Sequence, residues 1–335
     1  MDILIVGGTL FLGRHLVDAA TAAGHRVTLF NRGRTNPELY PDVEKLRGDR
    51  REGEYGALAE RRWDAAIDTC GYLPAEVRSL GVALGSEVDH YTFVSTLSVF
   101  ADQSVPNDEL SPVGSLDEAE SAELTNETYG PLKAACERVA EDAFPGRTLT
   151  VRPGLIVGPF DPTDRYGYWP HRLARGGEVL APRPTDQPVQ IIDGRDLAEW
   201  TVRMVEAGRT GVYNATSPAV TFEAMVDGCR RAAELMGAPP AEITWVDPAW
   251  LLERKVSPWS ELPVWLPAGG QFDGLHRTVV DRAVEAGLTR RPLDVVAADF
   301  LAWDRSRPAD GTWQHTLSSE REVELLDEWR SSGED

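Results

Sequence analysis

The first stretch of the chain constrains the fold more than any other, because it joins a buried strand to a glycine-rich turn. Residues 2–6 contain a short apolar run rich in β-branched side chains, which is typical of a buried parallel strand. Gly7 to Gly13 follow, then a helical pattern that ends at Gly24, and residues 26–30 predict a second strand. Strand, glycine-rich turn, helix and strand in this order are typical of a dinucleotide-binding unit, in which backbone N–H groups bind a pyrophosphate. Plain turn chemistry is the alternative explanation of the glycines.

The chain up to about residue 215 alternates predicted strands with predicted helices. Such alternation implies a sheet covered by helices on both faces, so we expect an α/β fold with a doubly wound, mostly parallel Rossmann sheet. The further predicted strands are residues 64–70, 90–96, 148–157, 190–192 and 212–214, and the predicted helices are residues 75–84, 127–144 and 195–206.

After Pro159 the chain changes character, since prolines and aromatic residues become dense. We therefore expect residues 1–160 with 188–215 to form the Rossmann domain, and residues 161–187 with 216–335 to form a smaller, mainly helical C-terminal substrate lobe. The tryptophans of this lobe are expected in its core, namely Trp245, Trp250, Trp259 and Trp265. Helices are predicted there at residues 222–235, 248–254, 282–286, 293–303 and 319–329.

Composition argues against several classes of partner. The net charge of −20 over 335 residues repels phosphate backbones, so nucleic acid is not expected as a partner. No apolar run reaches the length of a membrane span, and the N-terminal run is too short for a secretory signal, so we expect a cytoplasmic protein without a membrane partner. The three cysteines and six histidines are scattered without CxxC or HExxH spacing, so no disulfide framework and no metal site are expected.

Tyr129 and Lys133 form the candidate catalytic pair. On a helix, residues at this spacing lie on one face, one turn apart. The ammonium would then lower the phenol pKa from its ordinary value of ~10 and allow proton exchange with an alcohol or a carbonyl near neutral pH. Pro131 fits a helix only in its first turn, which predicts Tyr129 at the very start of the helix. The alternative is a surface lysine beside a half-buried tyrosine.

The end of the second predicted strand bears on the choice of cofactor. Sites selective for NAD usually place Asp or Glu there for the ribose 2′-hydroxyl, whereas Arg accommodates a 2′-phosphate. Here the strand is followed by Asn31, Arg32 and Arg34, with no acidic residue. We therefore predict NADP, with NAD as the alternative cofactor. A solvated loop is the other explanation of the two arginines.

Several motifs resemble those of the extended short-chain dehydrogenase/reductases, in the NAD-dependent epimerase/dehydratase family. They lie in the family's order and spacing and cover residues 1 to about 215. The matching segments are Gly7-Gly8-Thr9-Leu10-Phe11-Leu12-Gly13, Gly48-Asp49, Ser95 to Phe100, Tyr129 with Lys133, Arg152 to Pro159, and Asp193 to Leu197.

The resemblance implies roles for individual residues. Tyr129 would be the general acid/base, Lys133 would hold the nicotinamide ribose, and Thr96 would hydrogen-bond the reacting oxygen. Thr96 as a plain strand-end cap and Asp49 as a loop carboxylate are the alternatives. The implied cofactor-binding residues are Gly7, Thr9, Leu10, Phe11, Leu12, Gly13, Asn31, Arg32, Arg34, Asp49, Arg50, Thr69, Cys70, Gly71, Lys133 and Pro153.

Departures from the family pattern bear on the substrate. Leu97 and Ser98 stand where sugar-nucleotide 4,6-dehydratases carry an Asp-Glu pair, which argues against that elimination chemistry. Leu155 stands where sugar-nucleotide epimerases often carry an Asn that meets the substrate diphosphate. The expected substrate residues mix aromatic rings with cations, which suits a ring and an acidic group, although packing between the two parts would explain them equally. These residues are Tyr72, Arg165, Tyr168, Trp169 and Arg172.

The favoured function is an NAD(P)(H)-dependent oxidoreductase, of the carbonyl reductase or alcohol dehydrogenase type, that acts on a small metabolite. A sugar or nucleotide-sugar epimerase with retained NAD(P) is the first alternative, and a non-catalytic dinucleotide-binding protein is the second. Members of this family often pair, so a homodimer is expected. Plastid relatives associate with RNA, but the charge of −20 argues against RNA as a partner here.

Overall fold

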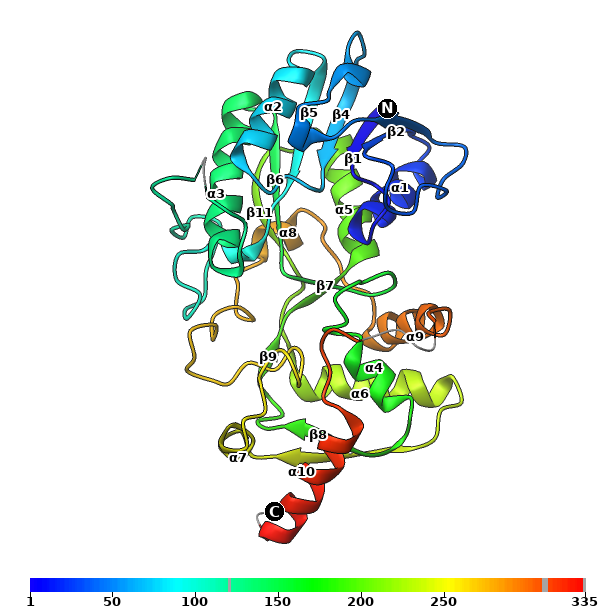
Figure 1. Cartoon of the computed structure of the whole chain (residues 1–335), viewed down its shortest axis with the longest axis vertical. Helices are drawn as coiled ribbons and strands as arrows, with labels where there is room; N and C mark the ends of the chain where they lie inside the picture. The colour runs from blue at the N-terminus through cyan, green and yellow to red at the C-terminus, as the bar shows by residue number, and fades with distance from the viewer. Residues whose placement is uncertain (120–121, 309–312, 334–335) are drawn as a thin grey trace.

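The computed structural model describes residues 1–119, 122–308 and 313–333. Within these residues, seven parallel strands form the central sheet in the order β11-β6-β5-β4-β1-β2-β3 (Figure 1). This arrangement confirms the predicted doubly wound α/β fold. The strands are β1 (Asp2–Val6), β2 (Arg26–Asn31), β3 (Glu44–Arg47), β4 (Trp63–Asp68), β5 (Val88–Val94), β6 (Thr148–Pro153) and β11 (Gly211–Ala215).

Helices cover both faces of this sheet. Helices α1 (Leu12–Ala22) and α5 (Gly194–Glu206) lie on one face, and α2 (Pro74–Leu84) and α3 (Asn126–Ala143) lie on the other (Figure 1). Successive side chains of β1 alternate between the two layers, as the pleat requires. Ile3 and Ile5 belong to the apolar cluster of α1 and α5, whereas Leu4 and Val6 belong to the cluster of α2 and α3.

The strand order reverses beside β1. The chain moves from β1 outward to β2 and β3, and then returns to β4 on the other side of β1. Open α/β sheets bind ligands at such a reversal, in the crevice outside the carboxyl ends of the strands. Three single-turn helices lie close to these strand ends along the chain, namely η1 (Arg50–Glu52), η2 (Gly56–Leu58) and η3 (Leu97–Val99).

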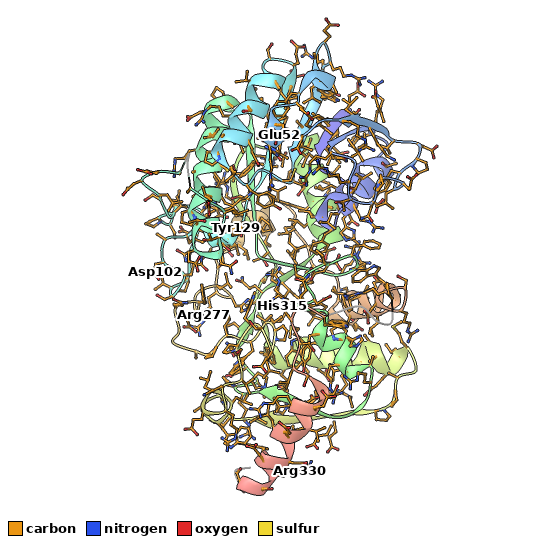
Figure 2. All side chains as sticks on the ribbon, viewed as in Figure 1. Glu52, Asp102, Tyr129, Arg277, His315 and Arg330 are labelled. Atoms are coloured by element: carbon orange, nitrogen blue, oxygen red, sulfur yellow. The ribbon has the colours of Figure 1, made fainter. Side chains whose placement is uncertain are left out.

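A second apolar core is built mainly from the C-terminal half of the chain. Strand β8 (Gly177–Pro182) pairs with β13 (Ala241–Val246), and helices α4 (Tyr168–Leu173), α6 (Phe222–Leu235) and α9 (Leu293–Asp304) pack together. Figure 2 shows Tyr129 near the junction of the two cores and Arg330 at the far end of the second. The other elements are β7 (Leu155–Val157), β9 (Pro188–Val189), β10 (Ile191–Asp193), β12 (Val220–Thr221), α7 (Pro248–Glu253), α8 (Asp281–Glu285) and α10 (Ser319–Ser332). Across the residue ranges given above, no helix is both long and apolar enough to cross a membrane.

The structure corrects several predicted elements. The strand expected over residues 148–157 splits at Gly154, so that β6 stays in the main sheet and β7 pairs with β10. A side chain at Gly154 would meet Thr216 Oγ1 at 2.8 Å, so the backbone passes this hydroxyl too closely for any other residue. The sequence patterns miss β3, β8, β13 and α4. β3 buries only Leu46, which leaves little periodicity to detect.

One C-terminal segment, which contains α8, packs on the face of the Rossmann sheet that α1 and α5 cover instead of in the second core. Ala283 of α8 and the nearby Leu288 belong to the apolar cluster of α1 and α5. Helix α8 also contacts β11, the edge strand of the main sheet. The division into two domains stays a prediction, and this segment is where the packing departs from it.

Candidate active site

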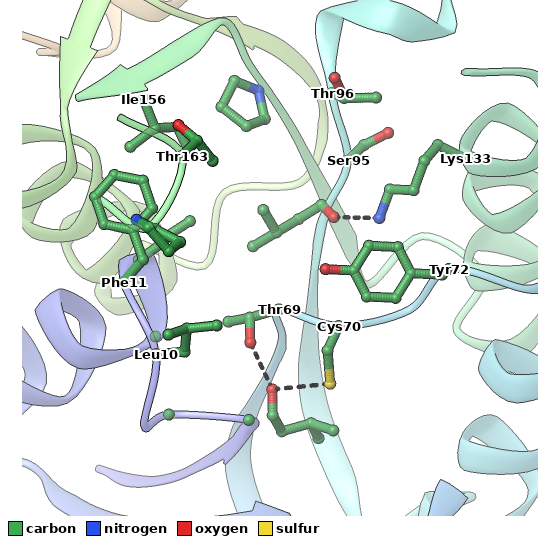
Figure 3. A pocket seen from close by; sticks show the side chains of 18 of the residues that line it. Leu10, Phe11, Thr69, Cys70, Tyr72, Ser95, Thr96, Lys133, Ile156 and Thr163 are labelled. Atoms are coloured by element: carbon green, nitrogen blue, oxygen red, sulfur yellow. Dashed lines mark hydrogen bonds between the residues drawn. The ribbon is translucent and has the colours of Figure 1, made fainter. Parts of the chain in front are cut away.

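A cavity of about 640 Å³ opens at the strand-order reversal (Figure 3). Its volume lies within the usual range for small-molecule and cofactor sites. The glycine-rich turn, Tyr129, Lys133, Thr96 and Arg165 all line it. Of the residues expected to bind the cofactor, all but Gly71 line this same cavity.

The glycine-rich turn has the geometry that a pyrophosphate requires. Gly7 and Gly8 have φ values of 109° and 90°, which side chains rarely tolerate. A Cβ on Gly7 would lie 2.4 Å from Thr69 Oγ1, and one on Gly13 would lie 2.8 Å from the Gly8 nitrogen. Phe11, the residue before α1, makes no side-chain hydrogen bond to the first turn of the helix. In that turn the Gly13 and Arg14 N–H groups donate to the Leu10 and Phe11 carbonyls, each at 2.9 Å, whereas the Leu12 N–H has no partner among the described residues. The helix N-terminus and the close backbone approach at Gly7 and Gly13 fit a dinucleotide.

The last residue of β2 contacts the glycine-rich turn, and the loop that follows β2 carries two accessible cations. Asn31 Nδ2 donates to the Gly7 carbonyl at 2.7 Å, while its Oδ1 accepts from the Gly33 N–H at 2.9 Å. Arg32 and Arg34 each lie 3.9 Å from Asp49 Oδ2, and their side chains are 44% and 73% exposed. Ion pairs of this length at the surface are weak, so both guanidiniums can contact a ligand.

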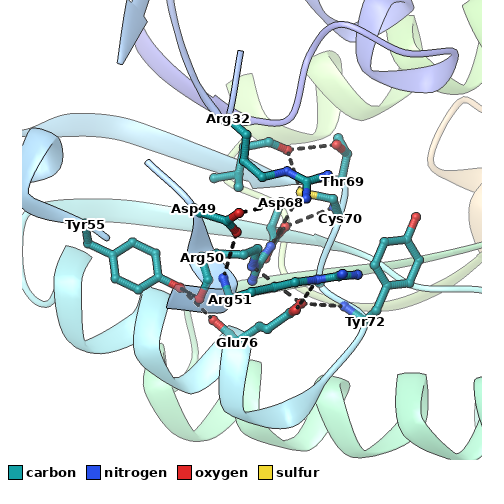
Figure 4. A network of polar contacts seen from close by, with 12 residues as sticks. Arg32, Asp49, Arg50, Arg51, Tyr55, Asp68, Thr69, Cys70, Tyr72 and Glu76 are labelled. Atoms are coloured by element: carbon teal, nitrogen blue, oxygen red, sulfur yellow. Dashed lines mark hydrogen bonds and ion pairs between the residues drawn. The ribbon is translucent and has the colours of Figure 1, made fainter. Parts of the chain in front are cut away.

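Arg50 is held in a buried network at the cavity wall (Figure 4). Its terminal nitrogens donate to both oxygens of Asp68, at 2.8 and 3.0 Å, and Tyr91 OH donates to Asp68 Oδ2 at 2.9 Å. Burial alone would raise the pKa of Asp68, but Arg50 and the hydrogen bonds hold it below its ordinary value. Glu76 lies 3.7 Å from the Arg50 Nε. Arg50 lines the cavity as expected, but its charge is already matched by these carboxylates.

The start of α3 positions Tyr129, though not as predicted. Thr125 caps the helix through a capping box with Thr128, and the Tyr129 N–H donates to the Thr125 carbonyl at 2.9 Å. The helix thus begins three residues before Tyr129, and Pro131 lies in the second turn. The helix accommodates Pro131 beyond its first turn, so the prediction that Tyr129 starts the helix is wrong.

Lys133 anchors the strand ends instead of acidifying the phenol. Its Nζ donates to the carbonyls of Gly71 and Val94, each at 2.7 Å, and Figure 3 shows the Lys133 ammonium in a hydrogen bond. Burial lowers the pKa of Lys133 to about 8. Burial also raises the pKa of Tyr129, and the groups that oppose this shift are Thr96, through a hydrogen bond, and the charge of Arg165. The predicted lowering of the Tyr129 pKa by Lys133 is therefore wrong, because the ammonium is directed to these two carbonyls.

A buried ion pair one turn further along α3 holds the helix against the sheet, and the sequence analysis misses it. Arg152 of β6 donates to Glu137 through Nε at 2.9 Å and Nη2 at 2.7 Å, and Ser95 Oγ also donates to Glu137. The side chains of Arg152 and Glu137 are only 5% and 9% exposed. The available signal is Glu137 at i+4 from Lys133, together with a charged residue inside the apolar strand β6.

Of the five residues expected to contact substrate, Tyr72 and Arg165 line the cavity. Tyr168, Trp169 and Arg172 do not line it, and they pack inside the second core. Trp169 Nε1 donates to the Pro263 carbonyl at 2.8 Å, and Arg172 Nε donates to Glu322 at 2.6 Å. Their side chains are used in packing and ion pairing, which corrects the expectation for all three.

Residues of the C-terminal half complete the cavity wall, and the sequence patterns do not predict them. Trp259, expected in the core, lines the cavity beside Leu275 and His276. Burial lowers the pKa of His276 to about 4, so its ring is neutral at pH 7. Its Nδ1 accepts from the Gln190 N–H at 3.1 Å. Within the described ranges, no group of three or more His, Cys, Asp or Glu side chains is placed to hold a metal ion.

Comparison with known proteins gives the same picture of the fold. No family model matches the chain. The chloroplast stem-loop binding protein of 41 kDa b from Arabidopsis thaliana is 25% identical over 266 residues, which are 73% of this chain and 66% of that protein. The chain thus matches just under two thirds of the length of that relative.

Solved structures match almost the whole chain. UDP-glucuronic acid 4-epimerase from Bacillus cereus, in complex with NAD, has a TM-score of 0.65 at 14% identity over 94% of this chain and 100% of that chain. Human epimerase family protein SDR39U1 (isoform2), with NADPH, has a TM-score of 0.58 at 19% identity over 89% of this chain and 99% of that chain. The chain has the fold of the extended short-chain dehydrogenase/reductases, and the resemblance predicted from the sequence is confirmed.

Proposed function

We propose that the protein is an NAD(P)-dependent oxidoreductase that acts on a small metabolite, with Tyr129 as general acid/base. The observation that carries the proposal is one continuous cavity lined by both the glycine-rich turn and Tyr129 with Thr96. A nicotinamide dinucleotide, when bound, supplies or accepts the hydride. The chain's own residues then have to hold the substrate and move one proton.

The raised pKa of Tyr129 defines the direction in which it acts most readily. Because burial raises this pKa, the phenol stays protonated at neutral pH. A protonated phenol can donate to the oxygen of a carbonyl substrate as that carbonyl is reduced. Thr96, which lines the same cavity, would share the reacting oxygen with the phenol. Lys133, fixed by the Gly71 and Val94 carbonyls, would position the nicotinamide ribose.

NADP is the proposed cofactor because of Arg32 and Arg34. Both guanidiniums line the cavity beyond β2 and are matched only weakly by Asp49. A 2′-phosphate there would gain charge-assisted hydrogen bonds, whereas NADH would leave both cations to water.

Isothermal titration with NADPH and NADH tests the cofactor assignment. We expect NADPH to bind more tightly, and Arg34→Gln to reduce that preference while leaving NADH binding unchanged. Tyr129→Phe should reduce turnover by about 10²–10⁴-fold and spare cofactor binding. Failure of both dinucleotides to bind would refute the proposal.

An epimerase with retained NAD(P) is the second proposed function, because solved structures of the same fold include an epimerase with bound NAD. Protein purified with tightly held cofactor, and no net oxidation of added NADPH, would favour it. The name of the plant relative refers to stem-loop binding, but the charge of −20 opposes RNA binding by this chain.

A further inference from the structure

The guanidinium of Arg165 is an unmatched cation in the cavity wall. Its Nε donates to Thr163 Oγ1 at 3.0 Å, and its guanidinium carbon lies 5.8 Å from the centre of the Trp259 ring. Among the residues that the structure describes, no carboxylate lies within 4.0 Å of Arg165, and its Nη1 and Nη2 have no hydrogen-bond partner. Arg50, Arg152 and Arg172 differ, since each is paired with a buried carboxylate.

The nearest acidic side chains do not supply the missing partner. Asp161 uses its Oδ1 to accept from the Thr163 N–H at 2.9 Å and from Thr163 Oγ1 at 2.6 Å. Its Oδ2 has no hydrogen-bond partner among the described residues, and its charge acts on Arg165 without a direct ion pair. Asp164 pairs with Arg307 at 2.7 Å instead. A half-buried guanidinium with two free N–H edges requires an anion, because desolvation of an unpaired charge is unfavourable. Burial also lowers the pKa of Arg165, and the opposing charge of Asp161 does not offset this shift.

The free guanidinium lies on the substrate side of the cavity. Arg165 is close enough to Tyr129 for its charge to lower the phenol pKa. The other cations of the cavity are either engaged, as Arg50 and Lys133 are, or lie beyond β2. His276 is neutral at pH 7. A single guanidinium with two parallel N–H groups matches one carboxylate, whereas a diphosphate usually needs several cations.

We propose that Arg165 binds the carboxylate of the substrate, so that the substrate is a small hydroxy or oxo acid whose carboxylate lies a few atoms from the carbon served by Tyr129. This inference rests on the proposed oxidoreductase function and names its substrate class. Trp259 and Leu275 would contact the carbon skeleton. Leu155, also in the wall, offers no hydrogen bond to a diphosphate.

Two measurements on the full chain test the proposal. The first is oxidation of short aliphatic and aryl 2- and 3-hydroxy acids with NADP⁺ and NAD⁺, each beside its primary amide. The second is calorimetric binding of the same acids and amides to protein saturated with NADP⁺, which does not depend on turnover. Both use wild type, Arg165→Gln and Arg165→Lys, with Arg209→Gln as the control, since Arg209 is exposed and lies outside the cavity.

We expect at least one acid to bind, its amide to bind at least ~30-fold more weakly, and Arg165→Gln to remove this difference while Arg209→Gln keeps it. Arg165→Lys should retain part of the difference in affinity between acid and amide, because lysine keeps the positive charge but lacks the paired N–H groups of arginine. Binding of acids and amides with equal affinity, binding of no acid, or an unchanged difference in Arg165→Gln would each overturn the inference. If acids bind through Arg165 but no hydride transfer occurs, the proposed oxidoreductase function is refuted and the carboxylate-binding role of Arg165 stands. If neutral alcohols are oxidised without any preference for acids, the role of Arg165 is refuted and the oxidoreductase function stands.

Discussion

The buried pair of Glu137 and Arg152 should control both stability and catalysis. It joins α3 to β6 one turn beyond Lys133, and Ser95 at the end of β5 shares the same carboxylate. Glu137→Gln removes the negative charge and keeps the shape. Arg152, whose Nη1 already has no partner among the described residues, is then left as a buried charge without a counter-ion.

The size of the effect follows from burial. Breaking a buried pair by removing one partner destabilises a protein by about 3–5 kcal/mol. The amide of Gln still accepts one hydrogen bond from Arg152, so we expect a loss of about 3 kcal/mol in the free energy of unfolding. Replacing both partners by apolar residues, as in Glu137→Leu with Arg152→Met, should recover most of that loss, because neither charge then stays buried.

Urea unfolding followed by circular dichroism measures the stability, and NADPH titration reports on the site. Asp142→Asn is the matched control, since Asp142 is exposed on the same helix and should change stability by less than about 0.5 kcal/mol. We also expect weaker NADPH binding in Glu137→Gln, because Lys133 lies one turn away on the same helix. A loss below about 1 kcal/mol, or a double variant less stable than Glu137→Gln, would refute the reasoning.

Four further predictions concern residues that line the cavity. Tyr129→Phe should reduce turnover by about 10²–10⁴-fold. In the wild type, oxidation of the alcohol substrate should accelerate as pH rises toward and beyond 10, because this direction needs the deprotonated phenol and the raised pKa of Tyr129 keeps it protonated at lower pH. A rate that reaches its plateau near pH 7 would contradict this. Gly7→Ala should weaken dinucleotide binding far more than Gly24→Ala in the same titration. Both glycines have a positive φ, but only a Cβ on Gly7 would meet another atom within 4 Å. Equal effects of the two substitutions would contradict the close contact at Gly7. The pKa of Lys133 falls from 10.5 to about 8 on folding, so the unfolded state binds more protons between these values. The stability of the wild type relative to Lys133→Met, measured by urea unfolding, should therefore rise as pH increases from 8 to 10.5, and a fall would refute the shift.

The sequence predicts the Rossmann sheet of this protein well because that sheet depends on local signals. Buried parallel strands appear as apolar runs, and the turn at Gly7 and Gly8 requires glycine. The cofactor-binding residues that the family resemblance implies all line one cavity except Gly71, whose carbonyl accepts from Lys133 instead. What the sequence does not predict is side-chain direction: Lys133 lies at the expected spacing from Tyr129, but the carbonyls of Gly71 and Val94 decide where its ammonium goes.

The second core depends on contacts between segments that are distant in sequence. Trp169, expected to touch substrate, instead donates from Nε1 to the Pro263 carbonyl. The loop that contains Pro263 also carries Trp259, whose N–H donates to the Trp265 carbonyl at 3.2 Å. Trp169 thus contacts the loop that carries Trp259, and Trp259 in turn lies beside Arg165. The composition of the 164–172 segment predicts aromatic and cationic side chains at the substrate, but only tertiary packing decides that Arg165 lines the cavity while Trp169 lies in the second core.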